Sequence, residues 1–344
     1  MKIEVCSTKE QERSWRNFVN NHVQATGYHR WEWKEVVENS FGWATFYLMA
    51  SELGTVQGIL PIVLQDSWLL GKSASSMPLL QGGGVLANDP EAAEALLQYA
   101  IDISQRSGAK YLELRYQSDP KLGLPMRKDK IRDVLAIDED TERMFRSLDS
   151  RLRTSIRKGS NAGLVAEFGG RNLLDEFYFV FARNMRDLGT PVYAKSFFEN
   201  VIASLAPNVH ICVVRDGIKP VASAFLIGYR DAIESAWASS IRESLKLKPN
   251  QFLHWNVVCF AARKGYRVLD FGRSSVGSGT HNYKAQWGSE TFPLYWCYWA
   301  PTIGRSVAVD RNDAKFRFAI RAWQKLPLTI ANWLGPTVVR HLPS

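Results

Sequence analysis

Apolar and polar positions recur in the same order in two stretches of the chain. In the first stretch, apolar runs flank Leu53-Gly54 and predict a hairpin, an apolar-periodic segment that stops at Gly108 predicts a helix, and a short apolar run predicts a buried strand. These elements are Thr45–Ala50 with Val56–Leu64, then Glu91–Arg106, then Tyr111–Leu114.

The second stretch repeats this order. A hairpin is predicted around Asp216-Gly217, a strong turn signal, and the following helix carries apolar residues at i, i+4, i+7 and i+8 before Gly265 ends it. The elements are His210–Val214 with Val221–Ile227, then Ala232–Ala238, Gln251–Lys264 and Val268–Phe271. In both stretches an acid stands five residues after the helix-ending glycine and an arginine follows: Glu113 with Arg115, and Asp270 with Arg273. The repeat predicts a duplicated α+β domain.

A helix is predicted between the two halves, over Thr141–Asn161. Its apolar stripe is Phe145, Leu148, Leu152 and Ile156, while Arg146, Arg153 and Arg157 share another face. From Arg151 to Lys158 there are four cations and no acid. Such a run is typical of a solvated face, and it also suits a surface that contacts phosphates or RNA.

Composition limits the class of protein. With 344 residues, of which 46% are hydrophobic and 22% charged, the chain suits two folded domains rather than disorder. We expect a first domain over 1–137, a second over 138–300 that carries the active site, and a basic amphipathic tail over 301–344. A net charge of +9 favours anionic partners. Four scattered cysteines, no signal segment and no apolar run long enough to cross a membrane predict free thiols and a cytoplasmic location.

Candidate chemistry gathers after the strand Val268–Phe271. The strand runs into Gly272, Arg273 and a loop that begins with Ser274 and Ser275, and Tyr283, Lys284, Trp287 and Gly288 follow. A glycine-rich loop with a cation at a strand end is typical of an anion-binding site. A P-loop is excluded because Ser278 stands where its lysine belongs, no G-x-S-x-G elbow exists, and the six histidines show no metal spacing.

Four segments resemble the FemAB family of peptidyltransferases, and most of all its subgroup associated with PEP-CTERM and exosortase systems: Leu152–Lys158, Met185–Tyr193, Glu234–Ser240 and the signature Tyr283-Lys284-x-x-Trp287-Gly288. The match runs from about Tyr28 to Tyr298 and is best in the second half. The resemblance implies an α+β fold of two tandem GNAT-like (acyl-CoA N-acyltransferase) domains, each a mixed sheet flanked by helices, and a role in cell-envelope biogenesis.

The resemblance also implies roles for two residues. Arg186 matches an arginine that holds the family's nucleotide-linked peptidoglycan precursor, and Lys284 matches a lysine that handles the aminoacyl donor. The family's first-domain lysine has no counterpart, since Lys34 is out of register. The donor is expected to be aminoacyl-tRNA or acyl-CoA, with no tightly bound cofactor. The glycine-rich pyrophosphate loop of ordinary GNAT enzymes is missing from Ser239–Asn250, although cations there can bind phosphate: Arg242, Lys246 and Lys248.

Acyl transfer needs a proton acceptor, an oxyanion partner and a proton donor. Glu234 lies within a predicted inner strand, so it is either a site residue or the ion-pair partner of Arg230 or Arg242. Tyr193 and Ser239 are candidate proton donors or oxyanion ligands, and Lys284 is a candidate site cation. Asp270 is expected to be structural, bonded to Arg273 or to neighbouring backbone. The predicted substrate-binding residues are Arg186, Arg273, Ser274, Ser275, Tyr283 and Trp237; no metal ligand is expected.

These residues predict a transferase that moves an aminoacyl or acyl group onto an amine of a peptidoglycan or exopolysaccharide precursor. Its expected partners are the donor, an anionic precursor, tRNA and a membrane surface. One alternative is an acyl-CoA- or acyl-carrier-dependent N-acyltransferase on exopolysaccharide sugars. The other is a non-catalytic membrane-surface or RNA-binding scaffold. The tail from Arg311, with six Lys/Arg and one Asp, suits either the inner face of a membrane, as a peripheral contact, or packing on the catalytic domain.

Overall fold

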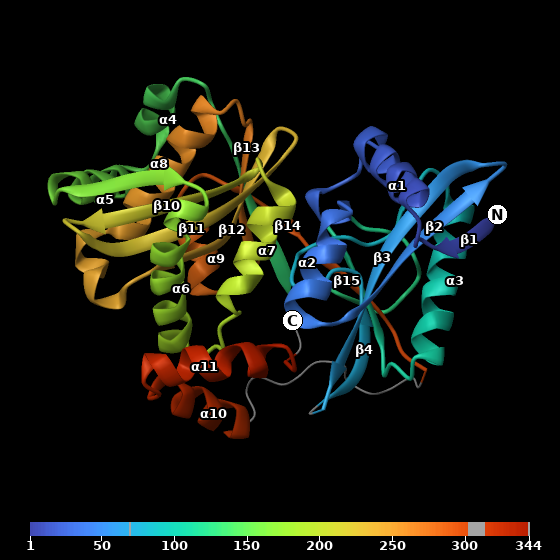
Figure 1. Ribbon diagram of the computed structural model, residues 1–344. Helices are drawn as coiled ribbons and strands as arrows, with labels where there is room; N and C mark the ends of the chain where they lie inside the picture. The colour runs from blue at the N-terminus through green and yellow to red at the C-terminus, as the bar shows by residue number, and fades with distance from the viewer. Residues whose placement is uncertain (69, 302–313, 343–344) are drawn as a thin grey trace. The chain divides into compact units, whose positions relative to one another are not determined.

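Figure 1 shows the computed structural model, which describes residues 1–68, 70–301 and 314–342. The chain forms two compact units. The first unit contains Met1–Asp129, strand β15 and the residues from Val338. The second contains Lys130–Phe292 and most of the C-terminal helix pair, up to Thr337. Each unit is built on one sheet with helices on both faces.

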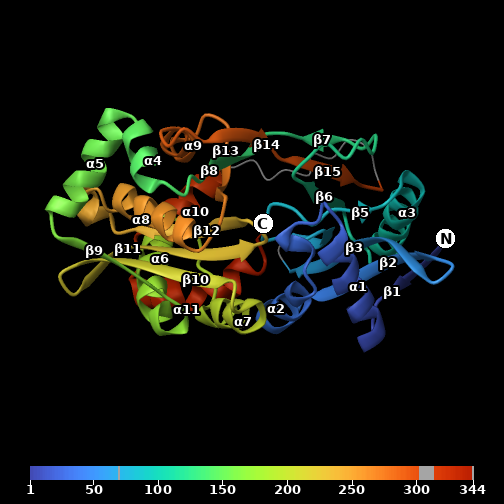
Figure 2. The same ribbon diagram turned by 90° about the horizontal axis from the view of Figure 1, so that it is seen from above.

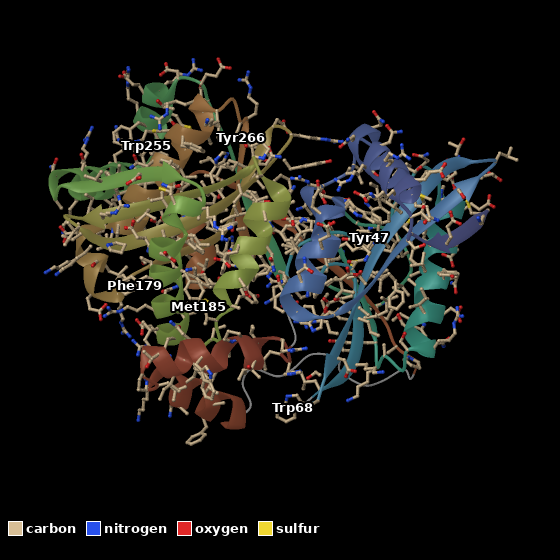
Figure 3. The ribbon with its side chains drawn as sticks, in the orientation of Figure 1. Tyr47, Trp68, Phe179, Met185, Trp255 and Tyr266 are labelled. Carbon is tan, nitrogen blue, oxygen red and sulfur yellow. The ribbon has the colours of Figure 1, made fainter. Side chains whose placement is uncertain are left out.

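The sheet of the first unit has the order β1-β2-β3-β4-β6-β15-β7, and β5 pairs with β3. Its strands are β1 (Lys2–Val5), β2 (Ala44–Glu52), β3 (Thr55–Ser67), β4 (Gly71–Ser75), β5 (Leu86–Ala87), β6 (Leu112–Tyr116), β7 (Met126–Arg127) and β15 (Tyr295–Trp299). Its helices are α1 (Lys9–Asn21), α2 (Glu32–Phe41) and α3 (Pro90–Arg106), with a 3-10 turn at Gly27–His29. Helix α3 packs on the face that carries Leu48 and Leu60. On the opposite face, the ring of Trp15 of α1 packs at a tilt against Tyr47, which is labelled in Figure 3.

The sheet of the second unit has the order β9-β10-β11-β12-β13-β8-β14. Its strands are β8 (Lys130–Ala136), β9 (Leu164–Gly169), β10 (Val209–Asp216), β11 (Lys219–Tyr229), β12 (Ala232–Ser240), β13 (Val268–Ser275) and β14 (Glu290–Pro293). Its helices are α4 (Thr141–Ser147), α5 (Ser150–Asn161), α6 (Leu174–Leu188), α7 (Lys195–Leu205), α8 (Pro249–Arg263), α9 (Gly279–Ala285), α10 (Ala314–Gln324) and α11 (Leu328–Val339), with 3-10 turns at Arg171–Leu173 and Arg242–Leu247. Helices α5 and α8 cover one face and α6 and α7 the other (Figure 2).

The two sheets repeat one plan, as the sequence pattern predicts. Each contains a parallel pair in the same position, β4 with β6 in the first unit and β12 with β13 in the second. The residues in register there are Ser75 with Glu113, and Glu234 with Asp270. The two acids that the repeat placed five residues after a glycine are therefore equivalent.

Each half of the chain contributes one strand to the sheet formed mainly by the other half. Strand β8 belongs by sequence to the first half, inside the domain expected at 1–137, yet it pairs antiparallel with β13 in the second sheet. Strand β15 follows the second unit in sequence but pairs antiparallel with β6 in the first sheet. Each sheet thus takes its sixth strand from the other half of the chain. The exchange brings residues of β8 to the inner part of the second sheet.

The single helix predicted over Thr141–Asn161 is wrong, because the structure has two helices there. Leu148 leaves the helix with extended backbone, and Asp149 begins α5 by accepting a hydrogen bond from the Arg151 backbone N–H. An aspartate is a strong N-cap, and it overrides a continuous apolar stripe. The stripe itself is confirmed, since Leu148, Leu152 and Ile156 are buried in the second core.

The tail forms helices α10 and α11. Helix α10 packs on α6, and Ile320 lies against Gly189 at the end of α6. Residues 302–313 of the expected tail, and the side chains of Lys315 and Phe316, lie outside the described residues. Within the part of the chain that the structure describes, no helix is long and apolar enough to cross a bilayer.

Candidate active site

The candidate site lies where β12 and β13 stop pairing. These parallel strands are in register over three residue pairs, of which Glu234 with Asp270 is the last. Strand β12 continues to Ser240 and β13 to Ser275, so the two strands do not pair with each other beyond Glu234 and Asp270. Five predicted site residues stand on these two continuations: Trp237, Ser239, Arg273, Ser274 and Ser275.

A β-bulge turns three site residues of β12 to one face. Phe225 of β11 is opposite Trp237 and the next residue, Leu226, is opposite Ser235, so Ala236 is the extra residue. In a regular strand Glu234 and Trp237 would point to opposite faces, because they are three residues apart. With the bulge, both lie on the face covered by α6 and α7. Ser239 lies there too, since its Oγ accepts a hydrogen bond from Asn184 Nδ2 of α6 at 3.1 Å.

Tyr193 joins this face from the loop between α6 and α7. Its ring is 6.4 Å from Trp237 and 5.2 Å from Phe197, and its carbonyl accepts a hydrogen bond from the Tyr178 hydroxyl at 2.9 Å. Trp237 also meets three phenylalanines edge to face or tilted: Phe197, Phe198 and Phe225. The structure therefore brings Tyr193, Trp237, Ser239 and Glu234 to one face, and an aromatic cluster holds the first two in place.

Asp270 has a structural role, as expected. Its Oδ1 accepts from the Gly272 backbone N–H at 2.8 Å, and its Oδ2 lies 3.2 Å from Arg132 Nη1. The expected bond to neighbouring backbone is confirmed, and Arg132 of the exchanged strand adds an ion pair. Gly272 adopts φ of +75°, and a Cβ atom there would lie 3.2 Å from the Ser235 carbonyl oxygen. The turn after Asp270 therefore favours glycine.

Lys284 is a buried amine beside this turn. Its Nζ donates to the Gly272 carbonyl oxygen at 2.7 Å and to the Arg273 carbonyl oxygen at 3.2 Å, and only 6% of the residue is exposed. Burial lowers the pKa of Lys284 to about 8, against the opposing effect of the carboxylates of Asp133, Asp270 and Glu234. The three acids thus offset part of the effect of burial on the pKa of Lys284. Two of them, Glu234 and Asp270, form the last strand pair.

Asp133 is the residue that sequence reasoning missed. It lies on the exchanged strand β8 and is fully buried, and its Oδ1 accepts from the Thr291 hydroxyl at 2.8 Å. Its Oδ2 is buried and has no hydrogen-bond partner within the described part of the chain. His281 Nε2 lies 3.8 Å from Oδ1. One signal was present: Asp133 stands midway between Ile131 and Leu135, at the buried phase of an alternating strand.

Helix α9 is held in place by the aromatic residues of its signature. The Tyr283 hydroxyl lies 2.9 Å from His254 Nδ1 of α8, and Trp287 is buried in the second core. Burial lowers the pKa of His254 to about 4, so this imidazole is neutral at pH 7. Tyr283, predicted to bind substrate, packs against the core. Tyr283 and Trp287 therefore anchor the segment of α9 that carries Lys284.

The remaining residues of β13 differ in their surroundings. Arg273 is exposed, and its charge lowers the pKa of Lys284. Ser275 Oγ accepts from Lys130 Nζ at 2.7 Å. Ser274 is buried, and its Oγ has no hydrogen-bond partner among the described residues. A buried hydroxyl of this kind costs free energy unless a ligand or water satisfies it.

Arg186 lies in the last turn of α6, which ends at Gly189 in the left-handed conformation. Its Nε donates to Asp187 at 2.7 Å and its Nη1 donates to the Leu326 carbonyl oxygen, between α10 and α11, at 3.0 Å. Arg186 is two residues beyond Asn184, which contacts Ser239. No contact joins Arg186 to Lys284 in the described residues.

The loop before α8 differs from a phosphate cradle. Arg242–Leu247 form a 3-10 turn, and Lys248 then adopts φ of +61° before Pro249 opens the helix. Arg242, Lys246 and Lys248 retain cationic side chains near the helix N-terminus, but a glycine-lined approach to a pyrophosphate is missing from this segment, as the sequence predicts.

The equivalent place in the first unit is filled. Arg115 is fully buried, pairs with Glu113 at 2.7 Å and donates to the Leu80 carbonyl oxygen at 2.7 Å. Its guanidinium lies 4.2 Å from the Trp296 ring, and the Tyr298 hydroxyl donates to Glu113 at 2.6 Å. Arg115, Glu113 and the Tyr298 hydroxyl thus all have internal partners at this strand end.

A separate cavity of about 1420 Å³ lies outside α9 in the second unit. Its apolar lining includes Leu135, Met144 and Trp287, and its charged lining includes Arg143, Arg151 and Arg267. Two of these cations are paired with acids, Arg143 with Asp138 and Arg267 with Glu139. Lys284 is not among the lining residues, so this cavity is distinct from the site built here. Among the described residues, no three His, Cys, Asp or Glu side chains are placed to hold a metal ion.

Residues 146–285 match the family model described as an acetyltransferase (GNAT) domain. The segment runs from α4 to α9 and includes most of the site. No curated protein matches the chain.

Solved structures share the fold. The crystal structure of FemX superposes with a TM-score of 0.67 at 14% identity, covering 86% of this chain and 97% of that one. The C-terminal domain of a putative lysylphosphatidylglycerol synthetase from Agrobacterium fabrum gives 0.57 at 15% identity, over 92% and 96%. A tandem GNAT protein of the clavulanic acid pathway gives 0.56 at 9% identity, over 88% and 100%.

The fold is that of two tandem GNAT-like domains, and residues 146–285 of the second match an acetyltransferase (GNAT) domain. The resemblance to FemAB-related proteins is confirmed at the level of the fold.

Proposed function

We propose that the second unit transfers an aminoacyl or acyl group to an amine of a cell-envelope precursor, at the end of the β12–β13 pairing. The observation that carries the proposal is Lys284: a buried amine with a pKa of about 8, held by two backbone carbonyls beside Asp133, Asp270 and Glu234. Perturbed, buried cations of this kind are concentrated at functional sites.

In this reaction the acceptor nitrogen forms a bond to the donor carbonyl carbon, and the ester C–O or thioester C–S bond breaks. The acceptor amine loses one proton and the leaving oxygen or sulfur gains one. Protonated Lys284 has three N–H donors and the backbone takes two, so the third is left to stabilise the oxyanion or to protonate the leaving group. Glu234, on the other side of the strand end, is the proposed acceptor for the proton of the amine.

The aminoacyl donor is favoured by two observations. The segment before α8 has no glycine-lined pyrophosphate cradle, which disfavours a coenzyme A handle. One similar fold carries a name that refers to an aminoacylated lipid, a putative lysylphosphatidylglycerol synthetase, and FemX agrees with the FemAB resemblance of the sequence. We propose aminoacyl-tRNA as the donor and an anionic precursor as the acceptor, with the exposed Arg273 and the partly covered Arg186 as its anion contacts.

The test is a donor screen by thermal shift with wild type and Lys284→Met. The donors are aminoacyl-tRNA, acetyl-CoA, a longer acyl-CoA and acyl-carrier protein, because a ligand that binds the native state must raise its stability. Mass spectrometry then follows transfer to a peptidoglycan precursor amine. A shift with aminoacyl-tRNA and a product lost in Lys284→Met supports the proposal. A shift with thioesters alone moves the donor to acyl-CoA or acyl carrier and the acceptor to a sugar amine. No shift and no product with any donor contradicts it.

A further inference from the structure

The C-terminal helix pair exposes apolar side chains in helical register. On α10, Phe318 is 74% exposed, and Arg321 and Ala322 follow at i+3 and i+4 on the same exposed stripe. On α11, Ile330 and Trp333 are 42% and 77% exposed, and the exposed Thr337 continues the stripe at i+7. Large aromatic side chains at such exposure mark contact surfaces when they recur in register.

The inner sides of the same helices are anchored. Ile320 packs on Gly189, Gln324 Nε2 donates to the Asp187 carbonyl oxygen at 3.1 Å, and Gly335 of α11 packs against Val192. The helices therefore do not need their outer stripes to hold the fold. In Figure 1 they lie beyond the end of α6.

The charge of this segment is one-sided. From Ala314 to Leu342 the chain has five Lys or Arg residues and no Asp or Glu. Arg321 and Lys325 are exposed at i+3 and i+7 from Phe318, and Arg340 is exposed just after α11. Aromatic side chains next to unopposed cations complement an anionic bilayer surface: the rings enter the interfacial region while the cations stay at the headgroups.

We propose that the exposed stripes of α10 and α11, formed by Phe318, Ile330 and Trp333 with Arg321 and Lys325, dock on an anionic lipid surface. The proposal stands apart from the transfer reaction, because docking needs no donor, acceptor or Lys284. It has a consequence for the site, since the connection between α10 and α11 also holds Arg186 through the Leu326 carbonyl oxygen.

The test is cosedimentation of the full chain with phosphatidylcholine vesicles, with and without phosphatidylglycerol. We expect binding only to the anionic vesicles, and less of it as salt is raised. The double variant Arg321→Gln with Lys325→Gln is expected to weaken binding roughly 30-fold at low ionic strength, since each cation near such a surface contributes about 1 kcal/mol. Phe318→Ser with Trp333→Ser is expected to weaken it by about tenfold or more, from the lost apolar contact.

Matched controls come from the same unit. Ile218 and Val165 are 92% and 61% exposed but lie outside the tail, so Ile218→Ser with Val165→Ser removes exposed apolar side chains and should leave vesicle binding unchanged. Lys219→Gln with Lys264→Gln removes two charges in the same way. Thermal unfolding of each variant shows whether it folds.

Three results would overturn the proposal. They are equal binding to neutral and anionic vesicles, equal loss in the control and tail variants, and no binding to any vesicle. If tail variants that fold keep vesicle binding but lose retention of tRNA, the helix pair is a nucleic-acid surface instead. A loss of vesicle binding with intact transfer, or the reverse, separates this proposal from the proposed function.

Discussion

At the scale of single residues, the site depends on an amine that the fold keeps from full solvation. Two carbonyl oxygens fix Lys284 Nζ, burial opposes its charge, and three carboxylates restore part of that charge. The local sequence indicates a lysine of interest through the Tyr283–Gly288 signature. Its pKa is lowered by burial, and acids from β8, β12 and β13 limit that lowering. Only the fold assembles them.

We expect the rate of transfer to fall as pH rises through about 8, because deprotonation of Lys284 removes the donor to the oxyanion. Measuring kcat/KM from pH 6 to 10 tests this. Lys284→Met should lower it by roughly 100-fold or more at pH 7, as for loss of an oxyanion donor. Lys284→Arg, where it folds, keeps a charge at all these pH values and should lose the descending limb. A rate that instead rises through pH 8 would assign Lys284 as a base.

Asp133 should set the pH at which the transfer rate falls, without contacting the substrate. Its carboxylate is the first of the groups that raise the pKa of Lys284, so Asp133→Asn is expected to lower that pKa and move the descending limb to lower pH. Thr291→Val, which removes the hydrogen bond to Asp133 but keeps the charge, should leave the limb near its place. A limb that stays put in Asp133→Asn would show that the two groups do not interact.

Lys284 also makes stability depend on pH. The folded pKa, about 8, lies below the ordinary value of 10.5. Between these two values the unfolded chain binds more protons than the folded chain, so the free energy of unfolding should rise with pH there. Urea unfolding of wild type and Lys284→Met from pH 7 to 10.5 tests it: the difference between them should change in this window. Parallel curves would mean that the native amine titrates normally.

At the scale of elements, the bulge at Ala236 and the turn at Gly272 decide which side chains meet. The alternation of side chains along β12 follows from the sequence. The bulge at Ala236 depends on how β12 pairs with β11. At Asp149 two local signals disagree. The aspartate favours the start of a new helix, whereas the unbroken apolar stripe favours one continuous helix. Local signals conflict there, and hydrogen bonding of the backbone decides.

Gly272→Ala should destabilise the second unit more than Gly277→Ala. Both glycines have positive φ, +75° and +72°, so both variants carry the left-handed penalty of about 1–2 kcal/mol. Only at Gly272 does a Cβ meet backbone, the Ser235 carbonyl oxygen at 3.2 Å, while nothing lies within 4 Å of the one at Gly277. Urea unfolding of the two variants measures the difference, and equal losses would contradict the close approach of β13 to β12.

At the scale of the whole molecule, the two units repeat one plan yet differ in what their strand ends do. Arg115 fills the strand end of the first unit with an internal ion pair and carbonyl bonds, whereas the second has Gly272, the amine of Lys284 and an unsatisfied Ser274 hydroxyl. Each sheet is completed by a strand from the other half of the chain.

The exchange makes a prediction about fragments. A fragment of residues 138–293 lacks β8, so β13 loses its antiparallel partner and the site loses Asp133 and Arg132. A fragment of residues 126–293 keeps both. We expect cooperative thermal unfolding, followed by circular dichroism, from the longer fragment alone. Cooperative unfolding of the shorter one would show that β8 is dispensable.

The sequence by itself determined the order of hairpin, helix and strand in both halves, the duplication and the class of fold, and its signature pointed to Lys284. It did so because amphipathic periods, glycine stops and a short signature are local properties of the chain. The tertiary structure alone decided the exchange of β8 and β15, the face shared by Glu234, Trp237 and Ser239, and the partners of Asp270 and Arg186. These depend on pairing between distant segments, where burial and electrostatics are set by neighbours far away in the sequence.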